Sequence, residues 1–392
     1  MKPTRRLLLQ SAAAATPAFA AKTTTKSNSA AVYERLGVKP LINGMGTVTV
    51  LGGSLMPLEV VQAMDDAARH FVHLPDLQKK AGAKLAEMLK VPGAMVTGGA
   101  AASISVGTIA CLTRGDKKRL QSLPDVGEGW RDVIMQKTHR SGYEHQMMMA
   151  GAKIVMVETA DELRRAITPR TAMLFYMNKA ENEGKIQRAE FIRIAKEKGV
   201  PTFNDAAADV PPKENLWNYV NRDGFDLVAF SGGKGMMGPQ SAGLLLGRKD
   251  LIEAATEGQS PYGGIGRGMK VGKEEIVGMV AAVERFLRVD HEAEARELDR
   301  RVAEMMKLIG NVKGVTMSRY VPEIANVVPH LALEFTAGSA HSAKQVHDQL
   351  LAGDPAIYTL LRGENSLMIS VWMMQGTEHR VVGKKLGELL KA

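Results

Sequence analysis

The stretch Asp226-Leu-Val-Ala-Phe-Ser-Gly-Gly-Lys-Gly235 decides the fold class of this chain. Its apolar run is typical of a buried strand, and it leads directly into a glycine-rich turn that holds one lysine, Lys234. Glycines let the backbone pass close to a bound ligand. A lysine held against an apolar, cation-rich site loses proton affinity and becomes an imine-forming nucleophile. A phosphate-binding loop is the alternative, but the G-x-x-x-x-G-K-[ST] pattern is absent because Gly235 follows the lysine.

A carboxylate lies upstream, in the segment Val200-Pro-Thr-Phe-Asn-Asp-Ala-Ala-Ala-Asp209. Here a predicted strand ends at Asp205, and three alanines follow. Ligands of α/β sheets bind outside the carboxyl ends of the strands, so Asp205 is expected at that rim. The small residues leave room for a flat ring, and the carboxylate suits a pyridinium nitrogen.

A third segment, Val96-Thr-Gly-Gly-Ala-Ala-Ala-Ser103, predicts a glycine turn that leads into a helix of small residues. The free backbone N–H groups at a helix start bind phosphate well, and two hydroxyls lie near them in the sequence. Each of the three segments alone is weak evidence for a site.

The surrounding pattern predicts an α/β fold with a largely parallel sheet covered by helices. Apolar runs expected to be strands are 153–157, 172–177, 201–204, 227–230 and 244–246. Helices are expected from residue 57, at about 77–89 and at 189–198, and a long charged helix at about 274–309. We expect these divisions: a signal peptide 1–20, a polar tether and arm 21–56, a large α/β domain 57–262, and a linker helix with a smaller α+β domain 263–392.

Composition narrows the function classes. The chain has 392 residues, 45% hydrophobic and 24% charged, which is ordinary globular composition. The net charge of +9 is scattered, as in the short runs Lys117–Arg119 and Arg164–Arg165, so we expect no nucleic-acid partner. The single cysteine, Cys111, permits no internal disulfide and is expected to be a small buried residue. We expect no metal site, since no HExxH motif or clustered His, Asp and Glu set is present.

The N-terminus resembles a twin-arginine export signal. Arg5 and Arg6 precede a weakly hydrophobic, alanine-rich stretch, and Ala18-Phe-Ala20 matches a small-x-small cleavage site. A helical arm is the alternative. Polar residues and Pro17 interrupt the apolar stretch, so we expect no membrane segment in the mature protein. The prediction is a periplasmic or secreted protein.

Taken together, the three segments resemble the fold-type-I (aspartate aminotransferase-like) enzymes that use pyridoxal 5′-phosphate (PLP). The group most similar contains bacterial selenocysteine synthase and D-glucosaminate-6-phosphate ammonia-lyase. The resemblance runs from about Tyr33 to the C-terminus. Its matching stretches are 36–43, 97–102, 139–143, 205–208, 231–234 with 238–240, and 266–274.

The resemblance implies a role for each matching residue. Lys234 would form the imine with the cofactor and later shuttle protons, and Asp205 would pair with the pyridine nitrogen. His139 or Tyr143 would stack on the ring, although His139 also suits a buried structural position. The residues implied to hold the cofactor phosphate are Thr97, Gly98, Gly99, Ala100, Ala101 and Ser231. The residues implied to bind phosphate or anionic substrate groups are Arg267 and Lys270, and Arg362 for a substrate carboxylate.

The reaction that the resemblance favours is α-proton abstraction and β-elimination on a small amino acid or amino-sugar acid, giving a 2-oxo acid and ammonia. A racemase, an aldolase or a C–S lyase would use the same lysine and aspartate. A selenium transferase-like protein would need tRNA, which an exported enzyme does not meet. A non-catalytic binding protein of the same fold is a further alternative. The resemblance also implies a homodimer or higher even oligomer.

Overall fold

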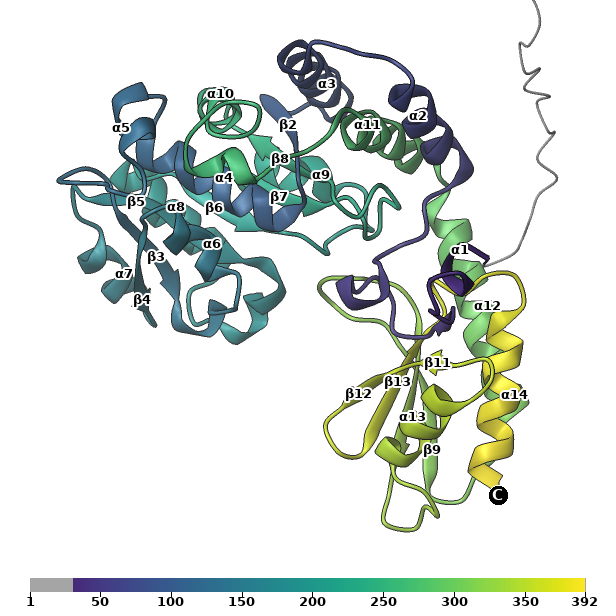
Figure 1. Ribbon diagram of the computed structural model, residues 1–392. Coiled ribbons are helices and arrows are strands. Elements are labelled where there is room, and N and C mark those ends of the chain that lie inside the picture. The colour runs from purple at the N-terminus through teal and green to yellow at the C-terminus, as the bar shows by residue number, and fades with distance from the viewer. Residues whose placement is uncertain (1–30, 392) are drawn as a thin grey trace, which may run out of the picture. The chain divides into compact units, whose positions relative to one another are not determined.

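The computed structural model describes residues 31–391. The chain forms two compact units, the first ending at Pro40 and the second beginning at Leu41. The described part of the first unit contains the short helix α1 (Ala31–Glu34). The second unit, from Leu41 onward, contains a seven-stranded sheet, a four-stranded sheet and a two-stranded pair (Figure 1).

The seven-stranded sheet is largely parallel, as the sequence predicts. Its strands, in spatial order, are β2 (Gly93–Thr97), β8 (Gly243–Gly247), β7 (Leu227–Ser231), β6 (Thr202–Asp205), β5 (Thr171–Met177), β3 (Asp132–Gln136) and β4 (Lys153–Val157). Only β8 runs antiparallel to its neighbours in this sheet. Strands β2 and β3 were not predicted from the sequence. Glycines at both ends of β2 indicate a turn rather than a strand when only the local sequence is considered.

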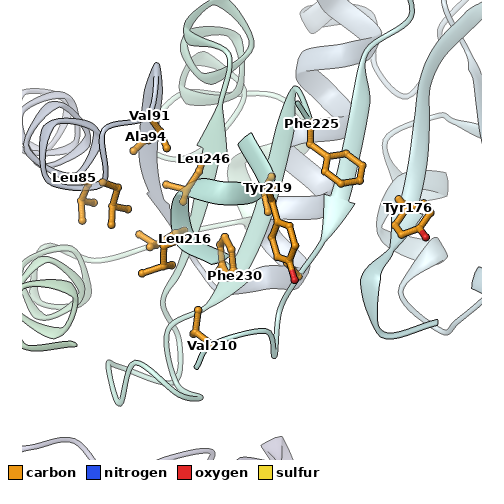
Figure 2. Close-up of a cluster of buried hydrophobic side chains, with 14 of the residues drawn as sticks. Leu85, Val91, Ala94, Tyr176, Val210, Leu216, Tyr219, Phe225, Phe230 and Leu246 are labelled. Atoms are coloured by element: carbon orange, nitrogen blue, oxygen red, sulfur yellow. The ribbon is translucent and has the colours of Figure 1, made fainter. Parts of the chain in front are cut away.

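Both faces of this sheet are buried, which explains why its strands are continuous apolar runs. Alternate residues point to opposite faces, so Val228 belongs to one hydrophobic cluster and Leu227 and Ala229 to another. The first cluster includes Leu85 of α3 (Leu74–Leu89), and Figure 2 shows this residue near Ala94 and Leu246. Burying each large apolar side chain contributes about 1.5–3 kcal/mol to stability.

The helices on the two faces of the sheet come from different parts of the chain. The helices on the face of the first cluster are α3, α8 (Arg188–Lys198) and α11 (Lys273–Arg288). The other face is covered by α4 (Ala100–Thr113) and α10 (Lys249–Glu257). Helix α2 (Leu58–Ala68) packs on α11 (Figure 1). Because α4 is buried on almost all sides, its N-terminus is fixed at one edge of the sheet.

The four-stranded sheet is antiparallel. Its strands, in spatial order, are β12 (Leu360–Arg362), β13 (Ser366–Ser370), β10 (His330–Phe335) and β9 (Val315–Tyr320). One face packs on helices α12 (His291–Ile309), α13 (Ala343–Ala352) and α14 (Glu378–Lys391), and α12 and α14 lie side by side (Figure 1). The pair β1 (Ile42–Asn43) and β11 (Ile357–Tyr358) joins the start of this unit to its C-terminal part.

The single helix predicted over 274–309 is wrong, because the structure contains two. Helix α11 ends at Arg288, and Val289 is extended with φ −66° and ψ 135°. Asp290 then caps α12: its side chain accepts a hydrogen bond of 2.9 Å from the Ala293 N–H. A residue of good N-cap type inside a charged helical pattern therefore marks a new start.

Within residues 31–391, no helix is long and apolar enough to cross a membrane. The predicted export signal lies outside these described residues, and the domain boundaries given above remain predictions.

Candidate active site

The three segments singled out in the sequence end at the same edge of the large sheet. Thr97 at the end of β2 and Ser231 at the end of β7 both pair with Gly243, from opposite sides. Asp205 at the end of β6 pairs with Ala229, one strand further along. Neighbouring strands lie about 4.8 Å apart, so the fold gathers these residues at one rim.

The turn that holds Lys234 is clamped by close backbone contacts. The Gly233 carbonyl accepts a hydrogen bond of 2.9 Å from the Ser54 N–H, which comes from the segment before α2. On the other side of the lysine, a Cβ atom on Gly235 would lie only 2.0 Å from the Val210 carbonyl oxygen. The position therefore requires glycine. These contacts fix the lysine between the strand end and the Asp205–Val210 segment.

The surroundings of Lys234 shift the pKa of its amine in opposite directions. Burial lowers the pKa of its amine, and the charge of Lys179 lowers it further, whereas Asp205 and Asp209 raise it. Burial raises the pKa of the Asp205 carboxyl, while the Ala207 N–H, 3.1 Å from its Oδ1, and the Lys234 charge act in the opposite direction. A half-buried amine with reduced proton affinity beside a buried carboxylate is suited to nucleophilic and general-base chemistry.

The start of α4 forms a cradle for an anion. Gly99 precedes it with φ 104° and ψ 170°, and no side chain caps the helix. The Thr97 and Ser103 hydroxyls lie 2.7 Å apart and both contact the Gly99 carbonyl, so their hydrogen bonds are made within the protein. Phosphate binding would therefore fall to the backbone N–H groups of Ala100 and Ala101, at the positive end of the helix.

The segment that carries Arg267 and Lys270 contacts this cradle through its backbone. A Cβ atom on Gly98 would lie 3.0 Å from the Lys270 carbonyl oxygen. Arg267 belongs to the short turn η5 (Ile265–Gly268), and both basic side chains are exposed. Two cations are thus carried next to the cradle, although which group they bind stays a prediction.

His139 and Tyr143 lie in very different surroundings. The His139 ring is fully buried, accepts a hydrogen bond of 3.1 Å from the Met177 N–H, and lies edge-on to Tyr176 at 4.5 Å. Burial lowers the pKa of its imidazole to about 4. His139 therefore packs against Tyr176 and links the ends of β3 and β5. Tyr143 is half exposed, before α6 (Glu144–Met149). Stacking on a cofactor stays a prediction for both rings.

Arg362 lies on the exposed face of the small sheet. Its guanidinium stacks over the Tyr320 ring, 5.2 Å from the ring centroid. Among the described residues, none of its side-chain contacts joins it to the lysine turn, so its role with a substrate carboxylate stays a prediction.

A polar cluster near Asp205 was not predicted from the sequence. Asp209 is 3% exposed and lines a cavity of about 230 Å³ together with Asn178, Arg188 and Tyr219. The Asn178 amide donates to the Tyr219 hydroxyl at 3.0 Å, and Arg188 donates to the Asn178 amide oxygen at 3.3 Å. Asp209 ends the segment quoted above, but nothing local distinguishes it from a surface carboxylate. Residues 31–391 contain no group of three His, Cys, Asp or Glu side chains arranged to hold a metal ion.

The chain is similar to known proteins over most of its length. Residues 133–317 match the aminotransferase class-V family. A 5′-C-glycyluridine monooxygenase-decarboxylase from Streptomyces sp is 32% identical, covering 83% of each chain. D-glucosaminate-6-phosphate ammonia lyase from Salmonella typhimurium is 29% identical, covering 83% of this chain and 88% of that protein. A solved structure of D-glucosaminate-6-phosphate ammonia-lyase, 28% identical, superposes with a TM-score of 0.80 over 94% of this chain and 99% of the other.

The residues at the sheet rim fit the cofactor that this family implies. A buried carboxylate for a ring nitrogen, a free helix start for a phosphate and an amine of reduced proton affinity lie at one edge. The protein is therefore an enzyme that belongs to the fold-type-I, aminotransferase class-V family of PLP-dependent enzymes, and it is similar to D-glucosaminate-6-phosphate ammonia-lyase.

Proposed function

We propose that this enzyme is a PLP-dependent lyase that converts a small amino acid or amino-sugar acid into a 2-oxo acid and ammonia. The observation that carries the proposal is Lys234, an amine whose pKa burial lowers, beside the buried carboxyl of Asp205. The likeness to an ammonia-lyase, in sequence and over 94% of the chain in structure, supports the reaction class.

Different residues at the sheet rim would bind different groups of the cofactor. Asp205 would bind its ring nitrogen, and the N–H groups of Ala100 and Ala101 would bind its phosphate. Bound PLP withdraws electrons from the substrate and so makes the α-proton acidic. The desolvated surroundings of Lys234 strengthen these charge interactions because little water competes for them.

Lys234 would move the protons of the reaction. Its Nζ accepts the substrate's α-proton, and the β-hydroxyl leaves with one proton as water. The released enamine takes up a proton at its β-carbon, water adds to the resulting C=N carbon, and ammonia departs. The net change is loss of ammonia from a β-hydroxy amino acid and formation of the corresponding 2-oxo acid. Lowered proton affinity keeps a larger fraction of the amine free to accept the proton at neutral pH.

The exposed cations would select an anionic substrate. Arg267 and Lys270 are carried beside the phosphate cradle, and Arg362 is the candidate for the substrate carboxylate. An acidic substrate would be attracted to these side chains more strongly at low salt than at high salt.

Exposed apolar side chains support self-association. Large hydrophobic residues between the arm and α3 are uncovered in this chain: Val50, Leu55, Leu58, Val61, Phe71 and Val72. Isolated exposed apolar residues are ordinary, but a group of this kind is typical of an interface. We propose a homodimer or higher even oligomer. A solution mass near 42.4 kDa rather than an even multiple would contradict it.

We also propose that the enzyme is exported by the twin-arginine route. Arg5, Arg6 and the Ala18–Ala20 site support this, and the route suits a protein that folds around its cofactor before export. N-terminal sequencing of periplasmic protein should show cleavage after Ala20. An uncleaved chain found only in the cytoplasm would overturn export and would reopen the tRNA-dependent alternative.

The deciding experiment is an absorption spectrum of purified protein before and after borohydride, followed by peptide mapping. The wild type should carry a visible band, and reduction should fix the cofactor on Lys234. Lys234→Ala should lose both the band and the adduct. Lys179→Ala, which removes a neighbouring exposed lysine, should keep both. A full band in Lys234→Ala would refute the site assignment.

A second candidate reaction is decarboxylation, because the relative named a monooxygenase-decarboxylase is 32% identical. A screen of D- and L-amino acids and amino-sugar acids should therefore measure ammonia, CO₂ and O₂ together. Ammonia release without CO₂ release or O₂ uptake supports the lyase. CO₂ release with O₂ uptake would replace it. A bound cofactor with no turnover of any compound would favour the binding-protein alternative.

A further inference from the structure

We propose that Asp209 is a positioning residue of the enzyme, whose buried carboxyl acts on Lys234 and Asp205 and sets the protonation state of the reactive amine. The inference rests on the proposed function only in taking Lys234 as that amine. Four observations about the Asp209 side chain and its backbone support it.

The backbone brings Asp209 next to both groups. Its N–H donates to the Ala206 carbonyl at 3.1 Å, which closes the turn that starts at Asp205. The next residue, Val210, is in tight contact with the residue after the lysine, since a Cβ on Gly235 would lie 2.0 Å from the Val210 carbonyl oxygen. Asp209 and Lys234 therefore precede two backbone positions that touch each other.

The Asp209 side chain is poorly satisfied for a buried carboxyl. It is 3% exposed, and its Oδ2 makes no hydrogen bond within the described part of the chain, although the Asn178 side chain lies close enough to lower the pKa of the carboxyl. A carboxylate with a purely structural role would normally have its oxygens paired. An unpaired buried carboxylate is costly when ionised, so this group responds strongly to nearby charge.

The turn also contacts the C-terminal part of the unit. The Asn326 N–H donates to the Ala208 carbonyl at 2.8 Å, and the Thr47 hydroxyl donates to the Asn326 side-chain oxygen at 3.2 Å. Ala325, beside Asn326, lines the same 230 Å³ cavity as Asp209. The surroundings of the carboxyl are thus completed by a loop of the small-sheet region.

Charged groups from several elements surround the Asp209 carboxyl. Burial and repulsion from Asp205 raise its pKa to about 7, while the Asn178 side chain, Lys234 and Arg188 of α8 act in the opposite direction. The charge of Asp209 also raises the pKa of the Tyr219 hydroxyl, on η4 (Tyr219–Asp223). The other titratable groups that line the cavity are Glu181, Arg222 and Glu323. Lys179 acts on Lys234 from the segment after β5.

As a consequence, the protonation of Asp209 is linked to the protonation of Lys234. Ionised Asp209 favours protonated Lys234, whereas neutral Asp209 favours the free amine that accepts the α-proton. Because Asp209 and Asp205 repel each other, the proton on this pair is lost near neutral pH. The pair thus adjusts the charge of the site in the pH range where the enzyme would work.

The test measures the titration of Lys234 in the protein prepared without PLP. Lysines are labelled with an amine-reactive reagent at a series of pH values, and modification of the Lys234 peptide is quantified by mass spectrometry. Asp209→Asn should lower the apparent pKa of Lys234 by about one unit, which is about a tenfold gain in free amine below that pKa. Asp209→Glu, which keeps the charge, should restore most of the wild-type value.

Asp223→Asn is the matched control. This carboxyl is also largely buried, since its side chain is 12% exposed, but it pairs with Arg188 and Arg222 rather than acting on Lys234. It should leave the Lys234 titration unchanged. An unchanged Lys234 pKa in Asp209→Asn, or an equal shift in Asp223→Asn, would overturn the proposal.

A second measurement covers the case in which Asp209→Asn does not fold. Carbon-13 NMR of wild-type protein labelled in its aspartate carboxyls should show one carboxyl titrating near pH 7, and this signal should vanish in Asp209→Glu. Absence of such a signal refutes the proposal. Because neither readout needs a substrate, a shifted Lys234 titration without any lyase activity would sink the proposed reaction and leave this inference standing.

Discussion

Gly235→Ala is the sharpest test of how the fold holds the lysine. The new Cβ would meet the Val210 carbonyl oxygen at 2.0 Å, its carbon at 2.8 Å and Trp372 Cη2 at 3.2 Å. Attractive contacts between heavy atoms begin near about 3.5 Å, so the lysine turn and the Val210 segment must separate by more than about 1 Å. Two backbone segments with buried neighbours cannot do this without loss of packing.

The magnitude follows from two effects. Overpacking a tight interior contact costs about 1–3 kcal/mol of stability. A displacement of about 1 Å at a catalytic group lowers the rate about 100-fold. We therefore expect a lower urea midpoint for unfolding, a weaker cofactor band at equal PLP concentration, and a large fall in kcat. Gly263→Ala is the control, since nothing lies within 4 Å of a Cβ there. Its free energy of unfolding should rise by up to about 1 kcal/mol.

Unfolding in urea, cofactor absorbance and kcat are measured on both variants and the wild type. A Gly235→Ala protein that matches the wild type in all three would show that the contact with Val210 does not constrain the lysine. If Gly263→Ala is impaired equally, then the loss is a general cost of replacing glycine.

Three further predictions concern stability and reactivity. His139 has a lowered folded pKa of about 4, so the unfolded chain binds its proton first, and stability should fall by up to about 1.4 kcal/mol per pH unit as pH drops from about 6.5 to about 4; denaturation curves across this range should lose that slope in His139→Gln but not in His70→Gln, and an unaltered slope would contradict the assignment. Burial raises the pKa of the Cys111 thiol to about 12, so iodoacetamide should label it only after unfolding, and labelling of the native protein at the rate of a free thiol would refute its burial. A Cβ on Gly107 of α4 would lie 2.3 Å from the Phe203 ring, so Gly107→Val should destabilise the protein by about 1–3 kcal/mol in chemical denaturation, and wild-type stability would mean that α4 can move away from the sheet.

Much of the rim could be predicted because its signals are local. The apolar run before Ser231, the glycines around Lys234 and the carboxylate after Asn204 lie within short segments whose backbone needs are visible in the sequence. Parallel strands then place their carboxyl ends at one edge by topology alone. For the same reason the mixture of strands and helices indicated the α/β class.

Other features were decided by contacts between distant segments. The sequence could not show that the Thr97 hydroxyl forms hydrogen bonds with the Gly99 carbonyl and the Ser103 hydroxyl, or that His139 is buried against Tyr176. One helix was expected over 274–309 because the charged helical pattern continues on both sides of Val289, and the N-cap role of Asp290 became clear only in the structure.

The sequence by itself determined which residues are candidates for the chemistry, because a strand, a glycine turn and a lysine specify a local geometry. Tertiary structure alone decided the protonation of those residues. Asp209 looks like any surface aspartate in the sequence. Only its burial near Asp205, in a cavity that Ala325 also lines, makes it a carboxyl that influences the charge of the site. The physical reason is that a pKa depends on desolvation and on nearby charges, and both are set by segments that meet only in the folded chain.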